Sequence, residues 1–197
     1  RPKISTLNKW RVESPRGFAF VLHATPEFVE ELVRLRDAEQ TDVSDTLREH
    51  WQTMLEYTQA LAAKAILLRT PPEFSPGPLS QALLANVSEE LAQPSKPALL
   101  WESSGLWSLR ASREFAEANG IVYAHDPFIA HRDELDLTHG DACWILTERA
   151  GMRRKFDQFD LERLVRWAEN YDRAFVLLRG RFKRDHAREM RHAVEYA

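Results

Sequence analysis

The sequence predicts an α/β fold of the TIM-type (β/α) barrel class, because short apolar runs alternate with helical patterns along the whole chain. The runs recur at a spacing of roughly 31 residues, close to the spacing in an eight-stranded barrel of about 250 residues. Most runs end in a charged or polar residue. The six runs are Phe18–Leu22, Ala65–Leu68, Ala98–Trp101, Ile121–Ala124, Ala142–Leu146 and Ala174–Leu178.

Capping residues and apolar periodicity predict the helices between these runs. Thr25, Pro26 and Glu27 form a helix start, with a capping side chain, a proline at the first helical position and an acid in the first turn. Ser108 and Asp160 are the predicted caps of two later helices. We expect helices over residues 3–13, 26–38, 44–63, 79–91, 109–118, 161–170 and 183–196.

Composition favours one globular domain over residues 1–197, with 44% hydrophobic and 29% charged residues. The net charge of -3 gives no general attraction to nucleic acid or acidic membranes. No apolar stretch approaches the roughly 20 residues of a membrane span, so we expect a cytoplasmic protein. Cys143 is the single cysteine and lies in an apolar run, which predicts a buried thiol rather than a nucleophile.

Polar residues at the run ends are candidates for acid–base chemistry. In parallel barrels the carboxyl ends of the strands share one face, so these side chains are expected to surround one opening. Polar strand ends also arise without catalysis, because any chain that leaves a core becomes polar. The candidate catalytic residues are Glu102, Asp126, His23 and His125, with Glu148 a further strand-end carboxylate.

Basic residues follow the last two runs, where barrels often bind phosphate through glycine backbone and helix N-termini. Arginine suits this role because its planar fork contacts phosphate through two hydrogen bonds. The alternative is a solvated basic surface. The predicted ligand-binding residues are Arg69, Trp107, Arg149, Arg153, Arg179 and Arg181, and we expect no cofactor.

Two further segments carry weaker signals. The loop 127–141 contains acids and histidines, including His131, Asp136 and His139, but at no spacing typical of metal ligands, so no metal is expected. From Arg173 to His192 there are seven Lys/Arg against two acids. The chain lacks a nucleic-acid-binding motif, so a solvated helix face is favoured over nucleic-acid binding.

Several motifs together resemble the YecE-like family, the domain of unknown function 72. Trp10 followed by Pro15-Arg16-Gly17-Phe18-Ala19-Phe20 is similar to its W…P-x-G-F-x-F segment, and Leu67-Leu68-Arg69-Thr70-Pro71-Pro72 to its L-F-Q-L-P-P strand end. Glu102 with Ser104 and Trp107 resembles E-x-R-x-x-S-W. Asp126-Pro127 resembles the end of the family's next strand, and Asp185-His186-Ala187 resembles the region of its last strand and helix. The resemblance implies a TIM-type barrel and no defined activity.

The departures from this pattern raise a second hypothesis. Arg69 replaces a glutamine, the Ser103-Ser104 pair replaces an arginine, Leu146-Thr147-Glu148 replaces R-x-H-G, and Leu178-Arg179-Gly180 replaces F-N-N. A divergent barrel without catalysis, acting as a protein-interaction module, is therefore the alternative to an enzyme or enzyme-like binder of a small anionic ligand.

The resemblance also implies that the family's first two strands precede Arg1-Pro2 and are absent from this chain. Six strands cannot close a barrel of the usual geometry, and open edges favour aggregation. We expect the gap to be covered by upstream residues, by a partner chain or second copy, or by the N-terminal helix.

Overall fold

The structure is a computed structural model that describes residues 2–91, 97–129, 140–147 and 156–195. The chain divides into two compact units, Arg1–Tyr123 (unit 1) and Ala124–Ala197 (unit 2), and the single domain over residues 1–197 stays a prediction. The elements, in order, are α1 (Ile4–Glu13), β1 (Val21–His23), α2 (Pro26–Asp37), α3 (Asp45–Leu61), β2 (Ala65–Arg69), α4 (Pro78–Leu91), β3 (Ala98–Glu102), α5 (Leu109–Ala118), β4 (Val122–His125), β5 (Asp141–Thr147), α6 (Gln158–Ala168), β6 (Arg173–Arg179) and α7 (Lys183–Glu195).

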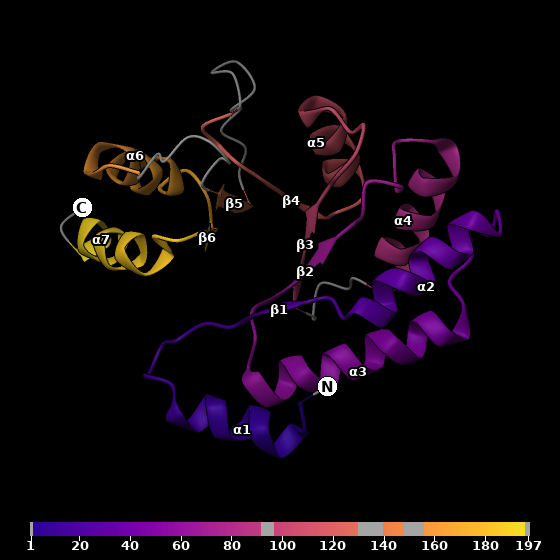
Figure 1. The fold of residues 1–197 in the computed structure, drawn as a ribbon, viewed down its shortest axis with the longest axis horizontal. Coiled ribbons are helices and arrows are strands. Elements are labelled where there is room, and N and C mark those ends of the chain that lie inside the picture. The colour runs from indigo at the N-terminus through magenta and orange to yellow at the C-terminus, as the bar shows by residue number, and fades with distance from the viewer. Residues whose placement is uncertain (1, 92–96, 130–139, 148–155, 196–197) are drawn as a thin grey trace. The chain divides into compact units, whose positions relative to one another are not determined.

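The six strands pair in parallel in the order β1-β2-β3-β4-β5-β6, so neighbours in the sheet are also neighbours in the chain (Figure 1). Helices occupy the connections before β2, β3, β4 and β6. This arrangement confirms the predicted α/β class and the incomplete barrel. β1 and β6 are the two end strands of this order.

Side-chain caps fix the starts of four helices. Thr25, Ser44 and Ser108 each accept a hydrogen bond from the backbone three residues later, as predicted for Thr25 and Ser108. The prediction that Asp160 is a cap is wrong. Asp157 is the cap of α6, and the two aspartates form a capping box in which each side chain accepts from the other's backbone N–H.

The first strand begins later than predicted. Gly17 has φ +79°, and the N–H of Phe18 bonds to the carbonyl of Pro15, so the chain is still turning at the start of the apolar run. Parallel pairing starts only at Val21, opposite Ala65. Phe18 is consequently half exposed and packs edge-to-face on Phe20.

The core of unit 1 lies between one face of its strands and the helices α2 to α5. Ile66 and Leu68 of β2 and Leu99 and Trp101 of β3 form the strand side of this core. The helix side is built by side chains that recur at helical spacing, among them Leu32, Leu47, Met54, Leu84 and Val87.

Helix α1 packs on α3 and toward β1. Leu7 of α1 is 1% exposed and contacts Tyr57 and Leu61 of α3, with Phe20 and Leu22 packed against the same cluster. The N-terminal helix therefore covers apolar side chains next to the first strand.

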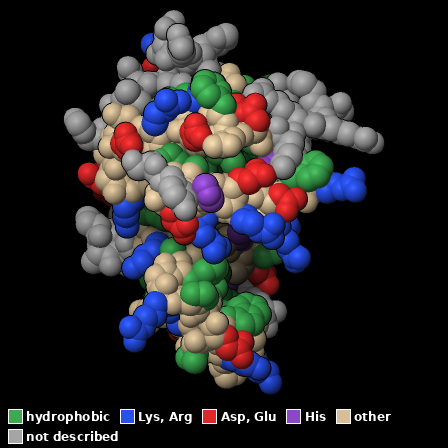
Figure 2. Space-filling view, turned by 90° about the vertical axis from the view of Figure 1, so that its left-hand side faces the viewer, with side chains coloured by type: hydrophobic (Ala, Val, Ile, Leu, Met, Phe, Trp, Pro, Cys, Tyr) green, Lys and Arg blue, Asp and Glu red, His purple; other side chains and the backbone are tan. Residues whose placement is uncertain are grey.

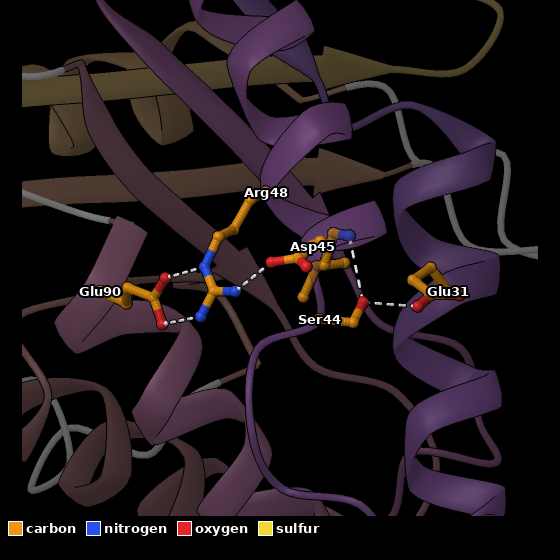
Figure 3. Close-up of polar contacts among 6 residues, drawn as sticks. Glu31, Ser44, Asp45, Arg48 and Glu90 are labelled. Carbon is orange, nitrogen blue, oxygen red and sulfur yellow. Dashed lines mark hydrogen bonds and ion pairs between the residues drawn. The ribbon is translucent and has the colours of Figure 1, made fainter.

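Polar contacts join α2, α3 and α4 at the surface of unit 1 (Figure 3). The Ser44 hydroxyl donates to Glu31 Oε1 at 2.6 Å, and Arg34 donates to both oxygens of Glu31. Arg48 of α3 donates to Asp45 Oδ1 at 2.7 Å and to both carboxylate oxygens of Glu90 on α4.

Unit 2 has its own core between α6, α7 and the strands. Ala142, Trp144 and Leu146 of β5 pack with Leu161 and Leu164 of α6. His186 of α7 is 1% exposed, and its ring lies 5.3 Å from that of Phe156. Cys143 is buried, as predicted.

The strands of unit 2 differ in burial. Residues 142–146 of β5 are buried on both faces, whereas residues 174–179 of β6 are only half buried. β6 therefore has the burial of an end strand.

Candidate functional site

In unit 1, the register places three of the predicted site residues on one face of the sheet. Leu22, Leu68 and Trp101 pack toward the helices. Because side chains alternate along a strand, His23, Arg69 and Glu102 lie on the opposite face, at or next to the carboxyl ends of β1, β2 and β3. Arg69 is directly opposite Glu102, whereas His23 is opposite Leu67 and lies one layer below.

Arg69 and Glu102 form an ion pair at this edge. Arg69 Nε lies 3.7 Å from Glu102 Oε1, and the side chains are 63% and 16% exposed respectively. The N–H of Thr70 donates to the Glu102 carbonyl at 3.1 Å, and the buried Trp101 indole donates to the Thr70 hydroxyl at 3.1 Å. The Arg69 guanidinium is exposed and can contact an anion. The Glu102 carboxylate is largely shielded from solvent and can accept a hydrogen bond.

The loops after β2 and β3 lie in close contact. Gly105 has φ +76°, and a Cβ built there would lie 2.4 Å from the Pro72 carbonyl oxygen. The Trp107 indole donates to the Phe74 carbonyl at 2.7 Å, and its ring packs edge-to-face on Trp101 at 4.9 Å. Trp107 thus connects the two loops and packs against the core, and its predicted contact with a ligand stays a prediction.

The serine that follows Glu102 is part of the internal packing. Ser103 Oγ lies 3.0 Å from the buried Ser112 hydroxyl and 3.1 Å from the Tyr123 hydroxyl. Ser103 directly follows Glu102, so the alternation of side chains predicts the helix-facing side for its hydroxyl.

In unit 2, His125 is the last residue of β4 and Asp126 follows the strand. His125 is in register with Trp144, which packs toward α6, so the imidazole belongs to the helix-facing side and its Nδ1 is buried. Asp126 Oδ1 accepts a hydrogen bond from the Phe128 N–H at 2.9 Å, which closes a local turn.

Arg179 ends β6 opposite Thr147, on the face away from α6 because Leu178 packs into the core. Gly180 follows with φ +101°. Arg181 is exposed, and its guanidinium carbon lies 6.0 Å from the centre of the Phe182 ring. Helix α7 begins two residues later, at Lys183. Arg149, Arg153 and Glu148 lie outside the described residues.

The structure also contains a groove that the sequence did not predict. It measures 1010 Å³ and lies between α6 and α7 of unit 2, with Leu161, Val165 and Ala193 among the residues that line it. No sequence signal marks it, because it depends on how two helices pack.

Among the described residues, no group of three His, Cys, Asp or Glu side chains could hold a metal ion. His131, Asp136 and His139 lie outside the described residues. None of the described helices combines the length and apolar character needed to cross a bilayer.

Six parallel strands in sequential order, with polar residues at their carboxyl ends, define an incomplete TIM-type barrel. The structure is similar to the crystal structure of a DUF72 family protein from Thermotoga maritima MSB8, with a TM-score of 0.68 and 13% sequence identity. The match covers 99% of this chain and 80% of that protein. No model of a known protein family and no curated protein matches the sequence. The structural neighbour supports the resemblance seen in the sequence, at the level of fold.

Proposed function

We propose that the protein binds a small anionic ligand, such as one carrying a phosphate group, at the carboxyl end of β6. The observation that carries this proposal is the connection from β6 to α7. Arg179, a glycine at positive φ and Arg181 precede the first turn of a 13-residue helix. Arginine forks and the backbone N–H groups of a helix N-terminus are the groups that proteins use for phosphate.

In unit 1, Arg69 is the residue that we expect to contact a ligand, because its guanidinium is the more exposed member of its ion pair. The proposed acid–base carboxylates are Glu102, which is ion-paired with Arg69, and Asp126, which accepts a backbone hydrogen bond within its own turn. Catalytic roles for Glu102, Asp126, His23 and His125 remain part of this proposal, with His23 the more accessible imidazole.

Thermal unfolding with and without inorganic phosphate tests the anion site, with sodium chloride at equal ionic strength as the salt control. A ligand at about 100 times its Kd adds about 2.7 kcal/mol to the free energy of unfolding. We expect this stabilisation in the wild type and in Arg191→Ala, an exposed α7 residue that matches the charge change, and its loss in Arg179→Ala. Equal responses in all three proteins, or none in the wild type, would refute the proposal.

A protein-interaction module is the second candidate, and the half-buried apolar residues of β6 favour it. A second copy that covers this strand should appear as a dimer in sedimentation equilibrium. Leu177→Lys on β6 should then reduce dimerisation, whereas Val194→Lys, at a 59% exposed position of α7, should not. A monomer at all concentrations would exclude the second copy.

A further inference from the structure

We infer that His186 is a ligand-binding residue of the anion site at the carboxyl end of β6, and that the ligand is a phosphate monoester rather than a diester. This inference rests on the proposed function and names the class of ligand for the same site. It follows from the position of His186 near the start of α7, from its buried Nε2 atom and from the kinds of donor group that meet there.

The imidazole of His186 is directed toward the start of α7. The backbone N–H of His186 donates to the Phe182 carbonyl at 3.0 Å, so Phe182 is the residue before the helix and Lys183 is its first helical residue. Side chains of a helix point back toward its N-terminus. The imidazole accordingly lies next to the Phe182 ring, with 6.2 Å between the ring centres. This places it beside the β6–α7 connection.

The Nε2 atom of His186 is a buried polar atom without a partner. The residue is 1% exposed, and Nε2 has no hydrogen-bond partner among the residues that the structure describes. An unpartnered polar atom in the interior costs stability, because it gives up its hydrogen bonds to water on folding. An acceptor oxygen of a ligand that reaches Nε2 would restore one of these bonds when Nε2 carries its proton.

Two aromatic rings contact the imidazole. Phe156, which is 5% exposed, lies 5.3 Å from it, whereas Phe182 is only half buried. The ligand oxygen should therefore enter on the side of Phe182, next to the β6–α7 connection. Figure 2 draws the side of the molecule on which α7 lies in Figure 1, and Lys and Arg side chains project from this side.

The start of α7 adds two further kinds of donor. The backbone N–H groups of residues 183–185 have no acceptor within the helix, and Phe182 has no side-chain oxygen that could cap them. Arg179 and Arg181 precede the helix and carry guanidinium forks, which suit phosphate oxygens. Together with the imidazole of His186, the connection thus offers charged, backbone and aromatic-ring donors to one ligand.

The three kinds of donor select the class of phosphate ester. A monoester has three terminal oxygens and a charge of about −2 at neutral pH, so the guanidiniums, the backbone N–H groups and the imidazole can each bind an oxygen. A diester has one terminal oxygen fewer and leaves one kind of donor without a partner, which weakens its binding. The carboxylate of Asp185 lies 4.0 Å from Arg188, which offsets part of its repulsion of an anion.

Isothermal titration calorimetry of the full chain with methyl phosphate and with dimethyl phosphate, at equal ionic strength, tests the inference. We expect the wild type to bind methyl phosphate about tenfold more tightly than dimethyl phosphate, or better. His186→Phe keeps an aromatic ring but removes Nε2, and it should weaken the binding of methyl phosphate by about tenfold. His186→Gln, whose amide nitrogen can replace Nε2, should restore most of the affinity.

The matched control is His192→Phe, the same replacement at an exposed position of α7. It should bind methyl phosphate as the wild type does, and circular dichroism verifies that the variants fold. A second measurement needs no variant of altered packing. In nitrogen-15 spectra of the wild-type histidine side chains, methyl phosphate should shift the Nε2 signal of His186, which is identified by its loss in His186→Gln.

The inference is overturned if dimethyl phosphate binds as tightly as methyl phosphate, if His186→Phe binds with unchanged affinity, or if the Nε2 signal does not shift. Stabilisation by inorganic phosphate that depends on Arg179 can persist in each of these cases, so this failure is distinct from a failure of the proposed anion site. A wild type that binds neither ester and is not stabilised by inorganic phosphate would overturn both.

Discussion

The carboxylate of Glu31 on α2 accepts a hydrogen bond of 2.6 Å from the hydroxyl of Ser44, the residue that caps α3. The same hydroxyl accepts the N–H of Leu47 at 3.1 Å, so one oxygen atom fixes the start of α3 and ties it to α2 (Figure 3). Glu31 is 8% exposed and would otherwise be costly to bury.

Ser44→Ala should therefore destabilise the protein by about 2 kcal/mol, because it removes a helix cap worth about 1 kcal/mol and one partner of a buried carboxylate. Ser108→Ala is the matched control, since Ser108 caps α5 with the Ala111 N–H at 3.1 Å. It should cost about 1 kcal/mol. Urea unfolding measures both changes, and equal losses would contradict the double role of Ser44.

The same carboxylate should make stability depend on acid pH. The hydrogen bonds from Arg34 lower the pKa of Glu31, and that from Ser44 adds to this, against burial, which raises it. A lowered folded pKa contributes stability above the unfolded value of about 4.3, and this contribution is lost as pH falls through the folded value.

Glu31→Gln should accordingly be less stable than the wild type at neutral pH, with the difference closing as the pH falls below about 4.3. Glu30→Gln, on the exposed side of α2, removes the same charge from the same helix and serves as the reference variant. The measurement is the urea midpoint of each protein from pH 7 to pH 3. A stability difference between Glu31→Gln and the wild type that stays constant over this range would refute the role of Glu31.

Gly105→Ala should be among the most destabilising single changes in unit 1. Its Cβ would lie 2.4 Å from the backbone oxygen of Pro72, in addition to the strain of φ +76°. We expect a loss of about 3 kcal/mol or more. Gly120→Ala has a similar φ of +64° but open space, so it should cost only about 1–2 kcal/mol. Similar losses of stability for Gly105→Ala and Gly120→Ala in urea unfolding would show that the loops after β2 and β3 move apart easily.

Arg48 forms ion pairs with two carboxylates, but its replacement should reduce stability less than the replacement of Ser44 does. The hydrogen bonds that Arg48 donates to Glu90 and then to Asp45 raise the pKa of Arg48, yet its side chain is 46% exposed and that of Asp45 is 95% exposed. Water and salt screen such pairs. We expect Arg48→Gln to destabilise less than Ser44→Ala and to lose its effect in 1 M sodium chloride. A loss that persists in high salt would contradict this.

Most of the fold could be predicted because strands and helices each leave a local pattern. The apolar runs at Ala65–Leu68 and Ala98–Trp101 match β2 and β3 because parallel strands are buried on both faces. Element ends were harder to predict. Asp157 and Asp160 both have the chemistry of a cap, and only the reciprocal backbone contacts decide between them.

The candidate site could be predicted only in part. Arg69 and Glu102 are the last residues of neighbouring strands, and the parallel register makes them partners. His125 lies on the helix-facing side of β4, and only its pairing with Trp144 of β5 decides this. The groove between α6 and α7 forms where the two helices pack together, so the sequence of either helix alone does not predict it.

The burial of Cys143 makes unit 2 separately observable. It is the single cysteine of the chain and lies at 1% exposure on β5, so a thiol reagent can modify it only when that unit opens. The rate of thiol modification therefore reports opening of unit 2 alone, whereas urea unfolding followed by circular dichroism reports both units. A comparison of the two shows whether the halves of this chain unfold together or one after the other.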